Sequence, residues 1–175
     1  GDPYDALAPL IQQQWIHVRG KQVELRHTLM GHVAVSGASA AEAVTVHKAA
    51  AQRLRNSRDL LELRAFHAIH GDADFEAFLL LEDVARARAA RGDGDGAIAA
   101  LSVAVGAARV QGMRGEAEAS SAALSVFGRK LATALVTAGR LDEAQGVLDE
   151  ILDASGPRDA TRAAVLDQQI GRAHV

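Results

Sequence analysis

The sequence predicts an all-α protein built from helical hairpins, and three observations support this prediction. The stretch from Leu131 to Leu152 contains two amphipathic segments joined at Gly139, with Ala132 and Ala144 where two helices would touch. Apolar residues make up 49% of the chain and aromatic residues only 3%, so the core must consist mainly of Ala, Leu and Val, which suits close helix packing. The 175 residues include only three prolines, so few helices are interrupted.

The expected helices follow the apolar periodicity and its turn and cap signals. Ser39 and Glu42 have the spacing of a capping box before the third helix. Ser57 and Asp74 are expected to cap the fourth and fifth helices, and Gly71 to end the fourth. About nine helices are predicted, at residues 5–18, 23–35, 40–54, 59–70, 74–91, 96–110, 116–138, 141–154 and 159–175.

The helices at 116–138 and 141–154 form the hairpin around Gly139. Asp142 and Glu143 lie in the first turn of its second helix, where free N–H groups favour negative charge. The apolar stripe of the hairpin is expected to comprise Leu131, Leu135, Leu141, Leu148 and Leu152.

This hairpin resembles a tetratricopeptide repeat, whose pattern has a small residue in the first helix, Gly at the turn and small residues in the second helix. The last copy of the pattern has Ala132, Gly139 and Ala144 at these positions, and Ile151 is an imperfect match at the last of them. A cleaner copy before it has Val84, Ala85, Gly92, Ala97, Leu101 and Ala104. A weaker third copy has Met30, Gly31, Ala34, Ala43 and Ala50, with its turn glycine, Gly37, displaced.

The copies are spaced more widely than regular repeats. Ala43, Ala97 and Ala144 are further apart than the about 34 residues of the family repeat, which implies longer helices or an inserted helix. The chain is similar in this to the irregular repeats of large bacterial signalling ATPases and transcriptional activators. The resemblance implies an α-solenoid forming one domain over residues 1–175, interpreted as a piece of a longer protein. Its parts are a weak repeat at 23–55, an extra helix at 56–71, repeats at 74–112 and 116–155, and a terminal helix at 158–175.

The resemblance also implies a scaffold that binds a segment of a partner protein in a concave groove. Carried over from the family's groove positions, the partner-binding residues would be Leu79, Glu82, Arg86, Val126, Arg129, Thr133 and Val136. Because Arg86 and Arg129 lie at equivalent or neighbouring repeat positions, and guanidinium groups pair with carboxylates, we expect a partner with acidic residues. The alternative is a regulatory module that senses an effector within a larger transcriptional activator or signalling ATPase.

The segment HAIHGDAD is the best candidate for a metal site. His67 and His70 would lie on one helix face, followed by Asp72 and Asp74, and imidazole and carboxylate groups are metal ligands. We favour a structural interpretation, in which the histidines complement the helix C-terminus and an aspartate caps the next helix. No metal or cofactor is therefore expected.

Other signs of catalysis are weak, and we do not expect an enzyme. The segment RGDGDGA lacks the glutamate of a calcium loop, because Ala104 occupies its twelfth position, and it also lacks the strand and lysine of a phosphate loop. It is interpreted as an inter-helix turn. No serine lies in a Gly-x-Ser-x-Gly elbow.

Charge and composition exclude several other classes. The formal net charge is −3, and the arginines alternate with acidic residues, which is typical of solvated helix faces and argues against nucleic-acid binding. The chain has no cysteine, so disulfide frameworks and thiolate metal sites are excluded. No apolar run approaches the length of a membrane span and the N-terminus does not resemble a signal peptide, so a cytoplasmic protein without membrane contact is expected. A homo-oligomer is also compatible with the sequence.

Overall fold

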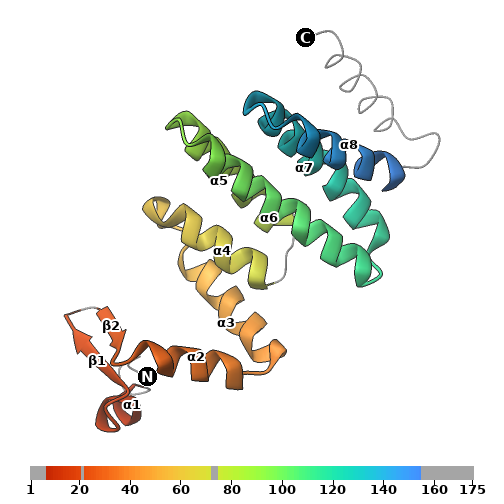
Figure 1. Cartoon of the computed structure of the whole chain (residues 1–175). Helices are drawn as coiled ribbons and strands as arrows, with labels where there is room; N and C mark the ends of the chain where they lie inside the picture. The colour runs from red at the N-terminus through yellow and green to blue at the C-terminus, as the bar shows by residue number, and fades with distance from the viewer. Residues whose placement is uncertain (1–6, 21, 72–74, 155–175) are drawn as a thin grey trace. The chain divides into compact units, whose positions relative to one another are not determined.

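The computed structural model describes residues 7–20, 22–71 and 75–154. Within these residues the chain is mostly helical, with eight α-helices and one pair of short strands (Figure 1). The chain divides into two compact units, Gly1–Val46 and His47–Val175. The helix predicted at 158–175 lies outside the described residues, as do Asp72 and Asp74.

The first unit contains a β-hairpin that the all-α prediction did not include. Helix α1 (Ala8–Gln12) is followed by the strands β1 (Ile16–Arg19) and β2 (Gln22–Leu25), which pair antiparallel, and then by α2 (Thr28–Gly37). The helices predicted at 5–18 and 23–35 are therefore wrong in their extent: the first ends early and the second begins late.

The local sequence explains this hairpin. Ile16 and Val18 alternate with polar residues, as expected for a strand. Gly20, at the turn, has a φ of 61°, a conformation that glycine adopts without a steric penalty. Across the strands, His17 Nε2 lies 2.8 Å from Glu24 Oε2, which supports the register His17 to Glu24.

Helix α3 (Ala40–Arg53) begins as predicted. The Glu42 N–H donates to Ser39 Oγ at 3.3 Å, and the Ser39 N–H donates to Glu42 Oε2 at 2.8 Å, so the capping box is formed. The Ser39 hydroxyl, which donates to Glu42 Oε2 at 2.7 Å, and then the Ser39 N–H lower the pKa of the Glu42 carboxyl group. The capping prediction for Ser57 is wrong: Ser57 precedes a short 3-10 turn, η1 (Arg58–Leu60), but its side chain makes no capping hydrogen bond.

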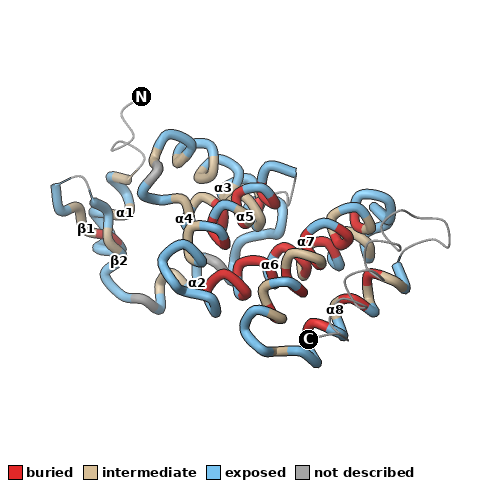
Figure 2. Tube along the Cα trace, turned by 90° about the horizontal axis from the view of Figure 1, so that it is seen from above, coloured by how far each residue is buried: buried red, intermediate tan, exposed pale blue. Residues whose placement is uncertain are grey.

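Five helices from the second unit follow one another with short connections. They are α4 (Leu61–Gly71), α5 (Phe75–Ala90), α6 (Gly94–Met113), α7 (Ala117–Thr137) and α8 (Leu141–Ala154), and each packs against the next. Their extents agree with the predicted helices to within a few residues. Burial is concentrated in α5 to α8, which carry most of the core (Figure 2).

The three turns that connect α5 to α8 have the same geometry. Gly92, Gly115 and Gly139 all have positive φ, at 81°, 91° and 75°. After each glycine, the next residue donates its N–H to the carbonyl five positions back, from Asp93 to Arg88, from Glu116 to Gln111 and from Arg140 to Leu135. This is the Schellman arrangement, in which glycine accommodates the left-handed position. The turns predicted at Gly92 and Gly139 are confirmed.

The hairpin of α7 and α8 packs through small residues. Ala132 and Ala144 are fully buried, as predicted. The closest approach lies at Gly128, where an added Cβ would be 2.8 Å from Ile151 Cδ1. The predicted apolar stripe is wrong at Leu141, which is about half exposed, although Leu131, Leu135 and Leu148 are buried and Leu152 is partly buried.

Alternate helices of the second unit run parallel to each other. The rings of Phe78 on α5 and Phe127 on α7 stack with centroids 5.2 Å apart, and Lys130 Nζ lies 2.6 Å from Glu82 Oε2. Because both residue numbers increase together, α5 and α7 run in the same direction. Two ion pairs relate α6 and α8 in the same way: Asp95 contacts Arg140, the residue before α8, and Arg109 contacts Glu150.

Within the described residues, α6 alone is long and apolar enough to span a membrane by length and composition. The expectation that no apolar run reaches this length is therefore wrong for α6. Half of the stretch is buried within the second unit, against α5 and α7, and this burial accounts for its apolar character.

Candidate partner-binding face

Exposed and partly exposed side chains of α5 and α7 lie on one side of the second unit, which we call the α5–α7 face. It comprises Phe75, Leu79, Glu82, Asp83 and Arg86 from α5, and Val126, Arg129, Lys130 and Thr133 from α7. On each helix these residues recur at spacings of three or four, so they share one side, opposite the residues buried in the core. Since α5 and α7 are parallel neighbours, the two stripes lie on the same side of the second unit.

Three apolar side chains are exposed on this face. Phe75 is 73% exposed, Leu79 43% and Val126 40%. The register that stacks Phe78 on Phe127 places Leu79 and Val126 at nearly the same level along the two helices. Clustered exposed apolar side chains with charged neighbours are typical of sites that bind other proteins.

Glu82 is the centre of the charged part of the face. Its carboxylate accepts from Lys130 Nζ at 2.6 Å and from Arg86 Nη2 at 3.1 Å. The hydrogen bond from Lys130, followed by the charge of Lys130 and the contact with Arg86, holds the pKa of the Glu82 carboxyl group below its usual value, against the effect of burial. Arg86 also donates to Asp83 at 2.9 Å. The face has three basic and two acidic side chains, so it keeps a small excess of positive charge.

The structure places most of the predicted partner-binding residues on this face. Val136 is the exception, because it is partly buried against the core. Arg129 is half-buried and donates from Nε to the Ser125 carbonyl at 3.1 Å, and Thr133 donates to the Arg129 carbonyl at 3.0 Å. The cation that reaches α5 is therefore Lys130.

Three residues of this face were not predicted from the sequence: Phe75, Asp83 and Lys130. Phe75 lies four residues before Leu79, and Lys130 lies four residues after Val126. Helical spacing from the chosen positions could have identified both residues.

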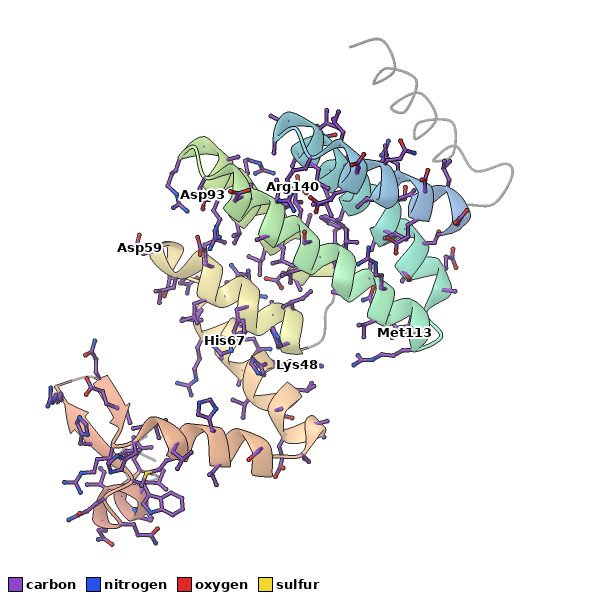
Figure 3. All side chains as sticks on the ribbon, viewed as in Figure 1. Lys48, Asp59, His67, Asp93, Met113 and Arg140 are labelled. Carbon is purple, nitrogen blue, oxygen red and sulfur yellow. The ribbon has the colours of Figure 1, made fainter. Side chains whose placement is uncertain are left out.

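The predicted histidine pair belongs to a cluster of three imidazoles. His67 and His70 on α4 lie next to His47 on α3, with His47 Nδ1 2.9 Å from His67 Nδ1 (Figure 3 labels His67). Burial, and then the charges of His67 and His70, lower the pKa of the His47 imidazole. His70 Nδ1 lies 2.8 Å from the Phe66 carbonyl oxygen, near the end of α4.

No group of three or more potential metal ligands with suitable geometry exists among the described residues. The two aspartates of the candidate metal site, Asp72 and Asp74, lie outside those residues. The RGDGDGA segment forms an inter-helix turn, as predicted: Asp93 Oδ1 accepts from the Gly96 N–H at 2.8 Å and caps α6.

Comparison with models of known families, with curated protein sequences and with solved structures finds no match to this chain.

Proposed function

We propose that the second unit is an α-solenoid of tetratricopeptide-like hairpins, and that it binds a segment of a partner protein along the α5–α7 face. Two features support the solenoid: the turns at Gly92, Gly115 and Gly139 share one geometry, and alternate helices run parallel. Stacked hairpins with these properties present their first helices along one side.

The observation that carries the binding proposal is the exposure of three apolar side chains on this face, Phe75, Leu79 and Val126. An apolar side chain of a partner would remove this surface from water, and contacts of this kind dominate the energy of most interfaces. The nearby cations Arg86 and Lys130 already contact Glu82, so they orient rather than anchor the partner. A partner segment with apolar anchors and flanking acidic residues, helical or extended, fits this surface.

The test is affinity capture with the parent chain and with Leu79→Ser/Val126→Ser, followed by binding measurements with each purified partner. We expect the double variant to lose partners that the parent captures, because two apolar anchors become polar. The matched control is Leu63→Ser/Val103→Ser, which changes side chains of similar exposure, 45% and 47%, on α4 and α6. Equal loss of partners in both variants, or in neither, would count against this face.

The charged part of the face can be tested separately. Arg86→Ala/Arg129→Ala should leave the helical content unchanged. Arg86 is largely exposed, and the hydrogen bond of Arg129 described above is to a carbonyl of its own helix. It should weaken partner binding and reduce its dependence on salt. Unchanged salt dependence would contradict the expected acidic partner.

One observation favours the second candidate function, a regulatory module that senses a small effector. A cavity of about 260 Å³ lies between α3, α4 and α5. Cavities between helices are common positions for small ligands. A saturable effect of a small molecule on the melting temperature of the chain, without any protein partner, would support this candidate.

A further inference from the structure

The cavity between α3, α4 and α5 is strongly basic. Among the described residues, its walls carry Lys48 from α3, Arg55 from the residues that follow α3, and Arg64 from α4, against one carboxylate, Glu76 of α5. These four side chains have a formal excess of two positive charges. The rest of the lining comes from Gln52 and from the apolar residues Ala51, Ala68 and Leu80.

The carboxylate of Glu76 contacts two guanidinium groups. Arg64 Nη2 bonds to its Oε1, and Arg55 Nη2 lies 3.4 Å from its Oε2. The Arg64 side chain is only 18% exposed. A partly buried guanidinium group loses much of its hydration. Because Glu76 also contacts Arg55, its single negative charge balances the charge of Arg64 only in part.

We propose that this cavity binds a small oxyanion with two negative charges. Two arginines can each present parallel N–H donors to an oxyanion, and a lysine adds a further charge from α3. The volume of about 260 Å³ lies just below the usual range for ligand sites, which favours a small molecule over a large cofactor. Phosphate and dicarboxylate groups share the required chemistry. This inference goes beyond the α5–α7 face and does not depend on it.

Binding would have a structural consequence. The cavity walls come from three helices, and Lys48 and Arg55 belong to the end of α3 or its continuation. An anion that contacts these residues together with Arg64 would hold the end of α3 against α4 and α5. It would therefore stabilise the folded second unit, because the unfolded chain has no such cavity.

The test is calorimetric titration of the whole chain with inorganic phosphate and, separately, with succinate, at neutral pH and constant ionic strength set with sodium chloride. We expect saturable binding of at least one probe and a parallel rise in melting temperature. The probe that binds more tightly distinguishes a phosphate site from a dicarboxylate site. Failure of both probes to bind saturably would overturn the proposal.

Two variants locate the binding. Arg55→Gln is expected to weaken anion binding roughly tenfold, the effect of losing one charge-assisted hydrogen bond. Lys48→Gln, which removes a positive charge from the α3 wall of the cavity, should also weaken anion binding. Arg91→Gln is the matched control: Arg91 is as exposed as Arg55, 64% against 63%, and lies 3.3 Å from its own glutamate, Glu62. Equal weakening by Arg55→Gln and Arg91→Gln, or unchanged binding in both cavity variants, would show that the cavity is not the site.

Discussion

Arg109 on α6 and Glu150 on α8 form a two-pronged ion pair, with Nε 2.7 Å from Oε1 and Nη2 2.5 Å from Oε2. The hydrogen bonds and the charge of Glu150 raise the pKa of the Arg109 guanidinium above its usual value, against the effect of burial. The two residues are 41 positions apart in the sequence, so the pair reports directly on the packing of α8 beside α6.

A double-mutant cycle of Arg109→Ala and Glu150→Ala should give a coupling free energy of about 0.5–1 kcal/mol, because the geometry is favourable but both side chains are partly solvated. Urea unfolding of the parent, the single variants and the double variant supplies the four values. Arg109→Ala combined with Asp142→Ala, at the other end of α8, should show no coupling. Absence of coupling in the first cycle would mean that the pair is not formed in solution.

Ala144→Leu should lower the free energy of unfolding by about 1–3 kcal/mol, since Ala144 is fully buried and a larger side chain overpacks the contact of α7 with α8. Thermal and urea unfolding measure the change. The control is Gln145→Leu, which adds the same side chain at the neighbouring exposed position and should have little effect. If Ala144→Leu is as stable as the parent, then Ala144 does not lie at the helix contact.

Two helical glycines should respond in opposite ways to alanine. Gly146 has open space around its missing Cβ, so Gly146→Ala should raise the free energy of unfolding by about 0.5–1 kcal/mol through helix propensity. The Cβ of Gly128→Ala would meet the buried Ile151 at 2.8 Å, so this variant should be less stable than the parent, by about 1 kcal/mol. Stabilisation by both substitutions would contradict the close approach at Gly128.

Stability should decrease as the pH falls below about 6.5, the usual pKa of histidine. The fold lowers the pKa of His47, so the unfolded chain binds protons more readily than the folded chain between the two pKa values. This contribution is fully present above pH 6.5 and is lost as the pH falls towards the folded pKa. Urea unfolding across this range should show a smaller slope for His47→Gln than for the control His32→Gln, which changes an exposed histidine of α2. Equal slopes would exclude His47 as the cause.

The sequence predicted the helices of the second unit well because their ends depend on local chemistry. Gly92 and Gly139 mark turns that require positive φ, and Ser39 with Glu42 marks a helix start through hydrogen bonds within four residues. The strands at 16–19 and 22–25 are not predicted from the sequence, because each is short and its apolar residues also fit one face of a helix.

The sites depended on contacts that no local pattern contains. His47 contacts His67 only because the end of α3 lies beside α4, and Lys130 contacts Glu82 only because α5 and α7 are neighbours. The basic cavity unites Arg55, Arg64 and Glu76, whose separate positions in the sequence resemble ordinary solvated charges. Predicting such groups of side chains would require knowing which helix faces contact each other.

The turns at Gly92 and Gly139 share one geometry, so a duplicated copy of the segment between them could be joined by a turn of the same type. The chain leaves α5 and α7 in the same conformation, and the helix that follows each turn packs beside a parallel counterpart. A duplicated segment would therefore start and finish at junctions that already exist in the fold. Growth or loss of whole hairpins by gene duplication or deletion would need no redesigned connection, whereas a cut inside α6 or α7 would leave an apolar helix face uncovered.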